Sequence, residues 1–174
     1  LTSMITNAIN VATTLVAIAL IDRIGRKRLL LIGSSGMVVM LAALTWLFGT
    51  APQIADGTGG TEPSLTGMSA TAAVLAFNAY VVFFGMSWGP VVWVLLGEMF
   101  PNRIRAAALA LAASAQWIAN FIVSPAFPPV AARSLTIAYG ILPAFAPASI
   151  FFVRTKVPET TGRSLEQISD EVSA

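Results

Sequence analysis

The sequence contains neither cysteine nor histidine, and charged residues make up only 10% of its 174 residues. Without cysteine and histidine, thiolate zinc sites, disulfide frameworks and catalytic pairs built on either side chain are excluded. Soluble domains carry about 25% charged residues, so the low charge content also excludes an ordinary soluble domain. The chain has the length of one domain and is too apolar to dissolve.

Long uncharged runs take the place of these residues. Apolar residues make up 56% of the chain, and its mean hydropathy is +0.80. All charges lie outside five segments of about 20 residues or more, each long enough to cross the roughly 30 Å hydrocarbon core of a bilayer. The sequence therefore predicts an all-α membrane protein in which a tail at 154–174 follows a five-helix bundle at 1–153. The predicted spans are about 1–21, 29–49, 70–97, 106–126 and 134–153.

The few charges lie mostly on one side of the predicted bundle. Because helix ends alternate between sides, the connections at 22–28 and 98–105 share a side with the tail. Nine of the ten basic residues lie on that side, and Arg133 lies on the other. Basic residues concentrate on the cytoplasmic side of membrane proteins, so we expect a cytoplasmic tail. The pI near 9.5 then reflects topology rather than binding to nucleic acid.

Proline and glycine mark the expected irregularities. The third span contains Gly85, Gly89 and Pro90, and we expect a kink there because proline removes a backbone hydrogen bond. The two glycines could widen a groove or permit a close helix crossing. The fourth span is expected to end near Pro125. Residues 50–69, rich in Gly, Thr, Ser and Pro, predict an outside loop that needs no regular structure.

Polar side chains within the spans are candidates for a binding site, because an unpartnered polar group costs free energy in hydrocarbon. At helical rise Asn10 and Gln116 lie roughly 18 and 16 Å from the cytoplasmic charges, and Trp93 lies lower with its indole leaning toward them. Two amides above an aromatic ring suit a sugar, whose hydroxyls bond amides and whose C–H face stacks on a ring. We predict that these three residues bind substrate, with interhelical packing as the alternative for each one alone.

Each of three charge clusters on the cytoplasmic side combines an acid with basic residues. The acids are Asp22, Glu98 and Glu159. Membrane anchoring needs only lysine and arginine and does not explain these acids. Salt bridges that hold the helix ends together, and that act as a gate when broken and remade, would explain them.

These residues resemble sugar porters of the major facilitator superfamily. The matching motifs are D-R-I-G-R-K at 22–27, W-G-P-V-V-W at 88–93, A-Q-W at 115–117 and P-E-T-T-G-R at 158–163. The resemblance covers essentially the whole chain and implies the C-terminal part, helices eight to twelve, of a twelve-helix fold whose N-terminal half is absent. The start at Leu1 agrees with part of a longer protein. The G-P-V-V-W motif is similar to that of bacterial proton–sugar symporters, which implies the bacterial inner (plasma) membrane.

The resemblance also implies roles for individual residues. Asn10, Trp93 and Gln116 match sugar-contacting positions, and Trp117 and Asn120 fall in a motif where packing is the first interpretation. A cytoplasmic charge network that stabilises the outward-facing state is implied at Asp22, Arg23, Arg26, Lys27, Glu98, Arg105 and Glu159. Thr161 stands where the family usually has lysine, and Gly85 where some members have an acid.

The implied function is secondary active transport of a monosaccharide by alternating access, without enzymatic activity, metal or cofactor other than a coupling proton. Proton-coupled symport is favoured, with facilitative uniport as the alternative. A transporter-like sensor is disfavoured by the short tail. Because the five spans contain no aspartate, glutamate, lysine or arginine, we expect the proton relay in the missing half. We also expect that this chain does not transport alone.

Overall fold

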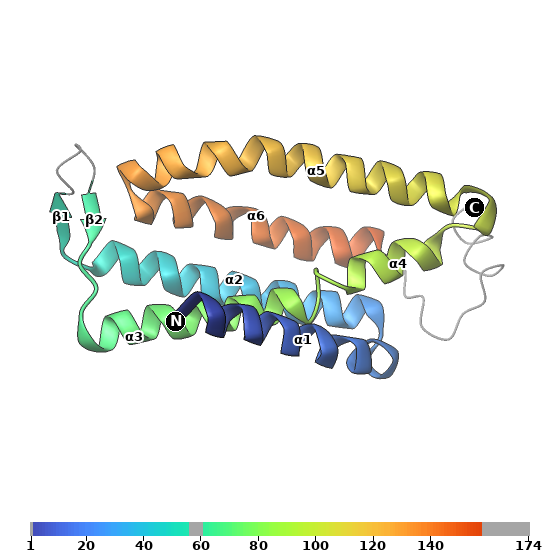
Figure 1. The fold of residues 1–174 in the computed structure, drawn as a ribbon, viewed down its shortest axis with the longest axis horizontal. Coiled ribbons are helices and arrows are strands. Elements are labelled where there is room, and N and C mark those ends of the chain that lie inside the picture. The colour runs from blue at the N-terminus through green and yellow to red at the C-terminus, as the bar shows by residue number, and fades with distance from the viewer. Residues whose placement is uncertain (1, 56–60, 158–174) are drawn as a thin grey trace.

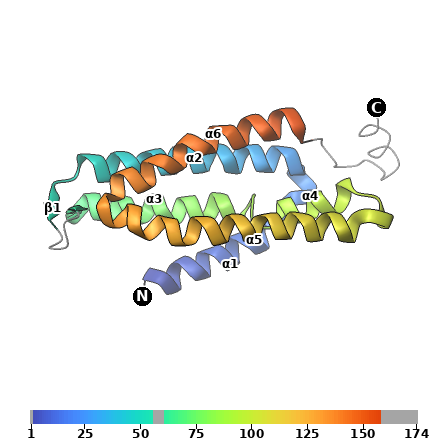
Figure 2. The same cartoon turned by 90° about the horizontal axis from the view of Figure 1, so that it is seen from above.

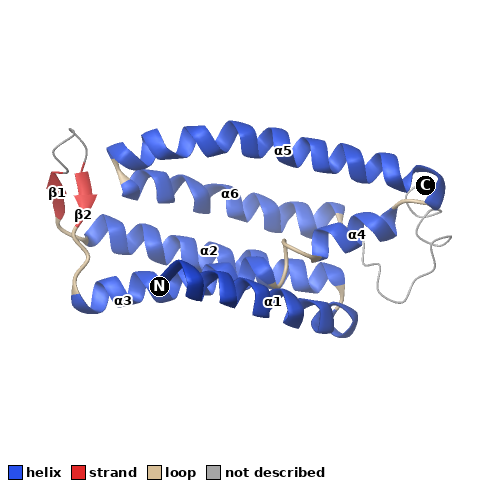
Figure 3. Ribbon diagram, viewed as in Figure 1, coloured by secondary structure: helices blue, strands red, loops and turns tan. Residues whose placement is uncertain are grey.

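The computed structural model describes residues 2–55 and 61–157 as a bundle of helices (Figure 1). The helices are α1 (Thr2–Ile24), α2 (Arg26–Thr50), α3 (Gly67–Gly85), α4 (Val91–Met99), α5 (Asn102–Arg133) and α6 (Leu135–Lys156). All except α4 are long and apolar enough to cross a membrane. The prediction of an all-α membrane protein with five such helices is confirmed, and Figure 3 shows how little of the described chain is not helical.

The third apolar run is two helices rather than one kinked helix. Helix α3 ends at Gly85, residues 86–90 form a turn, and α4 begins at Val91. The carbonyl of Phe84 accepts hydrogen bonds from the backbone N–H groups of Ser87 and Gly89, both at 3.1 Å. These bonds close the turn, and Pro90 lacks the N–H that would continue the α3 ladder. The helix is therefore interrupted at the glycines and proline where a kink was expected, but by a turn between two helices.

The fourth apolar run continues well beyond its expected end near Pro125. Helix α5 includes Pro125, Pro128 and Pro129 and ends at Arg133. Proline's fixed φ is compatible with a helix, so each proline removes one hydrogen bond without forcing the helix to end. In a bilayer the carbonyls freed in this way must face protein or water.

A neighbouring helix compensates one such loss in α6. Pro143 has no N–H to donate to the carbonyl of Tyr139, and Thr45 Oγ1 of α2 lies 3.0 Å from that carbonyl oxygen. Thr45 Oγ1 also lies 2.9 Å from the carbonyl of Leu41 in its own helix, so one hydroxyl proton is shared between the two acceptors. Side chains of this kind let membrane helices tolerate proline.

The connection between α2 and α3 contains a short antiparallel ladder, in a loop that by its composition needed no regular structure. Strands β1 (Gln53–Ala55) and β2 (Thr61–Pro63) pair with Ile54 opposite Glu62. Three residues on each strand suffice for this pairing, which composition alone does not reveal.

Helix α2 is the centre of the bundle. It packs most extensively against α6 and α3, and its buried residues include Leu29, Leu30, Met37, Leu41 and Leu44. Figure 2 shows α2 and α6 along one side and α1 along the other. Near its start α2 joins an apolar cluster formed by Ile21, Leu29, Leu30, Val91, Leu95, Val153 and Val157.

One end of the bundle collects the basic residues of the described chain. The α1–α2 turn, the start of α5 and the last turn of α6 meet at this end, on the right of Figure 1. These segments contain eight of the nine described basic residues, namely Arg23, Arg26, Lys27, Arg28, Arg103, Arg105, Arg154 and Lys156. Arg133 lies at the opposite end of α5. The uneven charge distribution is thus a property of the fold.

Candidate functional site

The turn between α1 and α2 places an acid and a base next to each other. Gly25 has a φ of 93°, a left-handed value that residues with a Cβ atom rarely adopt. It reverses the chain within one residue, so Arg26 begins α2 immediately after Ile24 ends α1. Arg26 Nη2 then lies 3.0 Å from Asp22 Oδ1.

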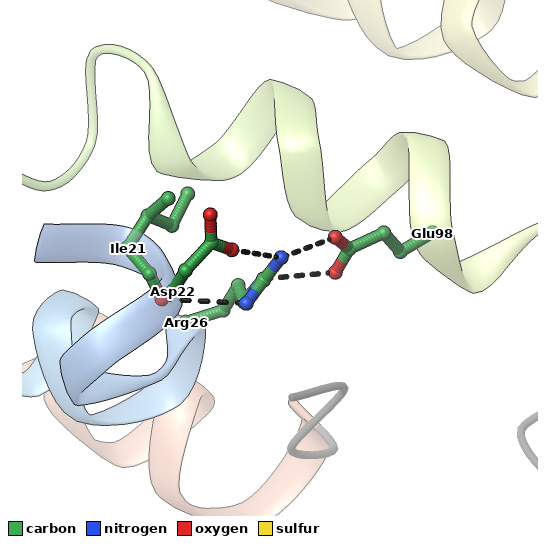
Figure 4. Close-up of polar contacts among 4 residues, drawn as sticks. All are labelled: Ile21, Asp22, Arg26 and Glu98. Carbon is green, nitrogen blue, oxygen red and sulfur yellow. Dashed lines mark hydrogen bonds and ion pairs between the residues drawn. The ribbon is translucent and has the colours of Figure 1, made fainter. Parts of the chain in front are cut away.

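Arg26 also reaches across to α4, where it forms a two-pronged ion pair with Glu98 (Figure 4). Its Nη2 lies 2.7 Å from Glu98 Oε1, and its Nε lies 3.0 Å from Oε2. A further bond of 3.3 Å runs from Nη1 to the carbonyl of Ile21. The guanidinium therefore joins the end of α1, the start of α2 and the end of α4.

Burial ranks the two ion pairs of Arg26. The exposed fraction of the side chain is 12% for Arg26, 30% for Glu98 and 75% for Asp22. Fork-to-fork pairs of arginine with a carboxylate are among the stronger charge-assisted hydrogen bonds, and shelter from water strengthens them. Exposed pairs contribute about 0–1 kcal/mol. The bond to Glu98 therefore holds these elements together, and Asp22 contributes little.

The other predicted members of the charge network form fewer polar contacts than Arg26 does. Arg105 donates from Nε to the carbonyl of Phe100 at 3.2 Å, which fixes the start of α5. Within residues 2–55 and 61–157, neither Arg23 nor Lys27 forms an ion pair. Glu159 lies outside the described residues.

The three predicted sugar-binding residues lie on three different helices. Asn10 is exposed on α1, Trp93 is 39% exposed on α4, and Gln116 is exposed on α5. Among the described residues no hydrogen bond joins any two of these side chains. All three are accessible, and their role in binding stays a prediction.

Gly85 lies where α1 crosses α3, and the spacing of the two helices there would also accept a Cβ at ordinary contact distances. Gly85 is buried, and a Cβ built there would lie 3.5 Å from Thr13 Cβ and 3.7 Å from the carbonyl oxygen of Asn10. A second contact between the same helices is the 3.1 Å hydrogen bond from Thr6 Oγ1 to Asn78 Oδ1. The crossing fixes the helix that carries Asn10.

On α5, Trp117 and Asn120 are exposed, although packing was the first interpretation for both. Trp117 is 72% exposed, and it lines a shallow groove of about 840 Å³ with Asn120, Ser124 and neighbouring apolar residues. The spacing of four between Gln116, Asn120 and Ser124 was the available signal, because it places them on one face of a helix. Among the described residues, no cluster of acids could hold a metal ion.

Comparison with known proteins now assigns the chain to a family. Residues 1–172 match the family model described as "Sugar (and other) transporter". The chain belongs to this sugar transporter family. It is 52% identical over 169 residues to a glucose transport protein of Synechocystis and 39% identical over 176 residues to the D-xylose-proton symporter of Escherichia coli.

Solved structures of the family agree with the fold. The inward-open xylose transporter XylE from E. coli superposes with a TM-score of 0.81 at 38% identity, covering 98% of this chain. XylE bound to 6-bromo-6-deoxy-D-glucose gives a TM-score of 0.80 at 36% identity over 98% of the chain. The match covers 97% of this chain with both curated relatives, but only 35% of the Synechocystis protein and 32% of the E. coli symporter. The chain therefore spans about a third of the length of these relatives and of the XylE chains.

Proposed function

We propose that this chain is the C-terminal part, helices eight to twelve, of a bacterial transporter that moves a monosaccharide across the plasma membrane by alternating access. The observation that carries the proposal is the Arg26–Glu98 ion pair at the basic end of the bundle. Its motif residues, D-R-I-G-R-K and the glutamate after W-G-P-V-V-W, lie far apart in sequence and meet in space. Relatives that include glucose and xylose transporters support the substrate class.

In this proposal the ion pair is a latch on a two-state equilibrium. The basic end faces the cytoplasm, as its excess of arginine and lysine favours. Binding sites of such transporters lie near the bilayer midplane, and rocking of the two halves exposes them to each side in turn. A latch that ties α1, α2 and α4 together at the cytoplasmic end stabilises the state closed on that side. Arg23, Lys27, Arg105 and Glu159 complete the proposed network.

The sugar is held by Asn10, Trp93 and Gln116 in this proposal, together with residues of the N-terminal half. Their exposure leaves the two amides and the indole accessible to a ligand. Asn120 and Ser124 continue the polar face of α5 beyond Gln116. An amide in a membrane helix needs hydrogen-bond partners, and a bound ligand or a water-filled cavity can provide them.

Equilibrium binding of D-xylose and D-glucose to the full-length transporter tests this site. We expect Gln116→Ala and Trp93→Ala each to weaken binding roughly tenfold, because each removes about 1.4 kcal/mol of contact. Trp46→Ala is the matched control, since Trp46 is an exposed tryptophan on α2 and its loss should leave affinity unchanged. Parent-like affinity in both site variants would exclude the assigned cavity.

We propose coupling to protons, with the coupling acid in the N-terminal half. Similarity to the D-xylose-proton symporter supports it. Facilitated diffusion is the second candidate, favoured by 38% identity to the glucose facilitated diffusion protein of Zymomonas mobilis. Sugar added to an unbuffered suspension of cells that express the transporter distinguishes them. Symport makes the medium transiently alkaline, whereas uniport leaves its pH unchanged.

A further inference from the structure

Two of the proposed functional residues depend on the placement of one short helix. Helix α4 has nine residues and carries both Trp93 and Glu98. It buries Val91 and Leu95 in the apolar cluster at the start of α2. Its start is attached to α3 through the turn at 86–90, so the contacts of that turn decide where α4 begins.

The turn is fixed against α2 by a hydrogen bond to a fully buried serine. Trp88 Nε1 donates to Ser34 Oγ at 2.8 Å, and Ser34 is fully buried. The neighbouring Ser87 is also fully buried and donates to the carbonyl of Phe83 at 2.5 Å. Trp88 is partly buried, and an indole N–H withdrawn from water needs a hydrogen-bond partner, which Ser34 supplies here.

Two glycines of α2 provide the room for this contact. A Cβ at Gly33 would overlap the side chain of Ser87 and come within 3.0 Å of the Phe83 carbonyl oxygen. A Cβ at Gly36 would overlap the ring of Phe83. The α2 surface around Ser34 is therefore shaped to receive the end of α3 and the turn.

Helix α2 thus has two polar attachments to the segment 88–98. Ser34 binds Trp88 at the start of that segment, and Arg26 binds Glu98 at its end. Ser34 and Arg26 lie eight residues apart, roughly 12 Å along the helix axis. The first attachment is neutral and ends on the fully buried hydroxyl of Ser34, whereas the second is ionic and 30% exposed at Glu98. Water therefore reaches the carboxylate of Glu98 more readily than the hydroxyl of Ser34.

We propose that Ser34 and Trp88 are positioning residues that form the pivot of α4. When the Arg26–Glu98 pair opens, the Trp88–Ser34 bond keeps the turn seated on α2, and α4 moves about it as a unit. The pivot thereby connects the opening of the cytoplasmic latch to the position of Trp93. This inference rests on the proposed transport function.

Distances between two spin labels in the full-length transporter, in a background free of other cysteines, test the pivot. Gly97→Cys places one label on α4, where a Cβ meets nothing within 4 Å, and Lys156→Cys places the other at the exposed end of α6. We expect Trp88→Phe and Ser34→Ala each to at least double the width of the distance distribution. The double variant should widen the distribution no more than either single variant, because both changes remove the same hydrogen bond. Glu98→Gln should add a second distance while each peak stays narrow.

Trp46→Phe and Ser114→Ala are the matched controls. Trp46 is exposed on α2, and Ser114 is exposed and, among the described residues, bonds only the carbonyl of Ala110 in its own helix. Both should keep the parent width. Parent-like widths in Trp88→Phe and Ser34→Ala, widening in only one of them, or equal widening in the controls would each overturn the pivot. If Trp88→Phe does not insert into the membrane, Ser34→Ala alone decides, because it removes a single oxygen atom.

The same samples separate this inference from the proposed function. Label distances report the pivot without any sugar, and equilibrium binding of D-xylose and D-glucose is measured in parallel. A parent protein that binds neither sugar while the distances change as expected would contradict the proposed function and leave the pivot standing. Normal binding with unchanged distances would contradict the pivot alone.

Discussion

Helices α2 and α5 are both long and apolar, yet the chain covers them very differently. Seven residues of α2 are buried, and none of the 32 residues of α5 is. On α5 the large side chains of Leu111, Trp117 and Phe121 are all more than 70% exposed. Hydropathy identifies both as membrane spans but does not say what surrounds them. Neighbouring helices of the chain bury one face of α2, whereas the described part of the chain buries no residue of α5.

The largest expected effect compares one leucine from each helix. Leu44 on α2 is 2% exposed and Leu111 on α5 is 74% exposed. Leu44→Ala should leave a cavity and destabilise the full-length protein by about 2 kcal/mol or more, as large-to-small changes in packed interiors do. Leu111→Ala should cost well under about 1 kcal/mol. Unfolding of both variants in matched detergent measures the difference, and equal costs would show that α5 is covered by protein as closely as α2.

The same contrast applies within the single guanidinium of Arg26. Double-mutant cycles with Glu98→Gln and Asp22→Asn measure its coupling to a sheltered and to an exposed carboxylate. We expect about 1.5–3 kcal/mol for Glu98, typical of hydrogen bonds to charged groups. For Asp22 we expect about 0.3–0.5 kcal/mol, typical of exposed i,i+4 pairs. A larger coupling at Asp22 than at Glu98 would contradict the burial ranking.

The smallest effect concerns two threonines of α2. Thr45 bonds the carbonyl of Tyr139 that Pro143 leaves free, whereas Thr50 is exposed and bonds only its own helix. Thr45→Val should cost about 0.6 kcal/mol, the average for an interhelical hydrogen bond in a membrane. Thr50→Val should be neutral within the error of a thermal unfolding measurement. If the two variants melted alike, the hydroxyl of Thr45 would not compensate for Pro143.

Local sequence signals predicted the helices better than their ends. Uncharged runs of about 20 residues identify membrane spans because charge is excluded from the hydrocarbon core. Proline was a poor guide to their ends. Pro125 lies within a continuing helix, whereas Pro90 follows a real break. The difference depends on tertiary contacts, since the turn before α4 is seated on Ser34 and the glycines beside it.

The charge network was predicted more fully than the binding site. An acid beside basic residues at two helix ends indicated ion pairs, and the structure joins Asp22, Arg26 and Glu98. Sequence could not rank the pairs, because the shelter of Glu98 comes from the packing of α4 on α2. Nor did it indicate that Trp88, the first residue of the W-G-P-V-V-W motif, bonds Ser34, because the two lie 54 positions apart and carry no charge.

The sequence by itself determined that this protein is a helical membrane protein with one basic end, because hydropathy and charge act residue by residue. Only the tertiary structure decided which arginine bonds which acid, where α3 stops, and which apolar helix the bundle covers. Those outcomes depend on distances between residues far apart in the chain. The packing of α2 against its neighbours determines these distances.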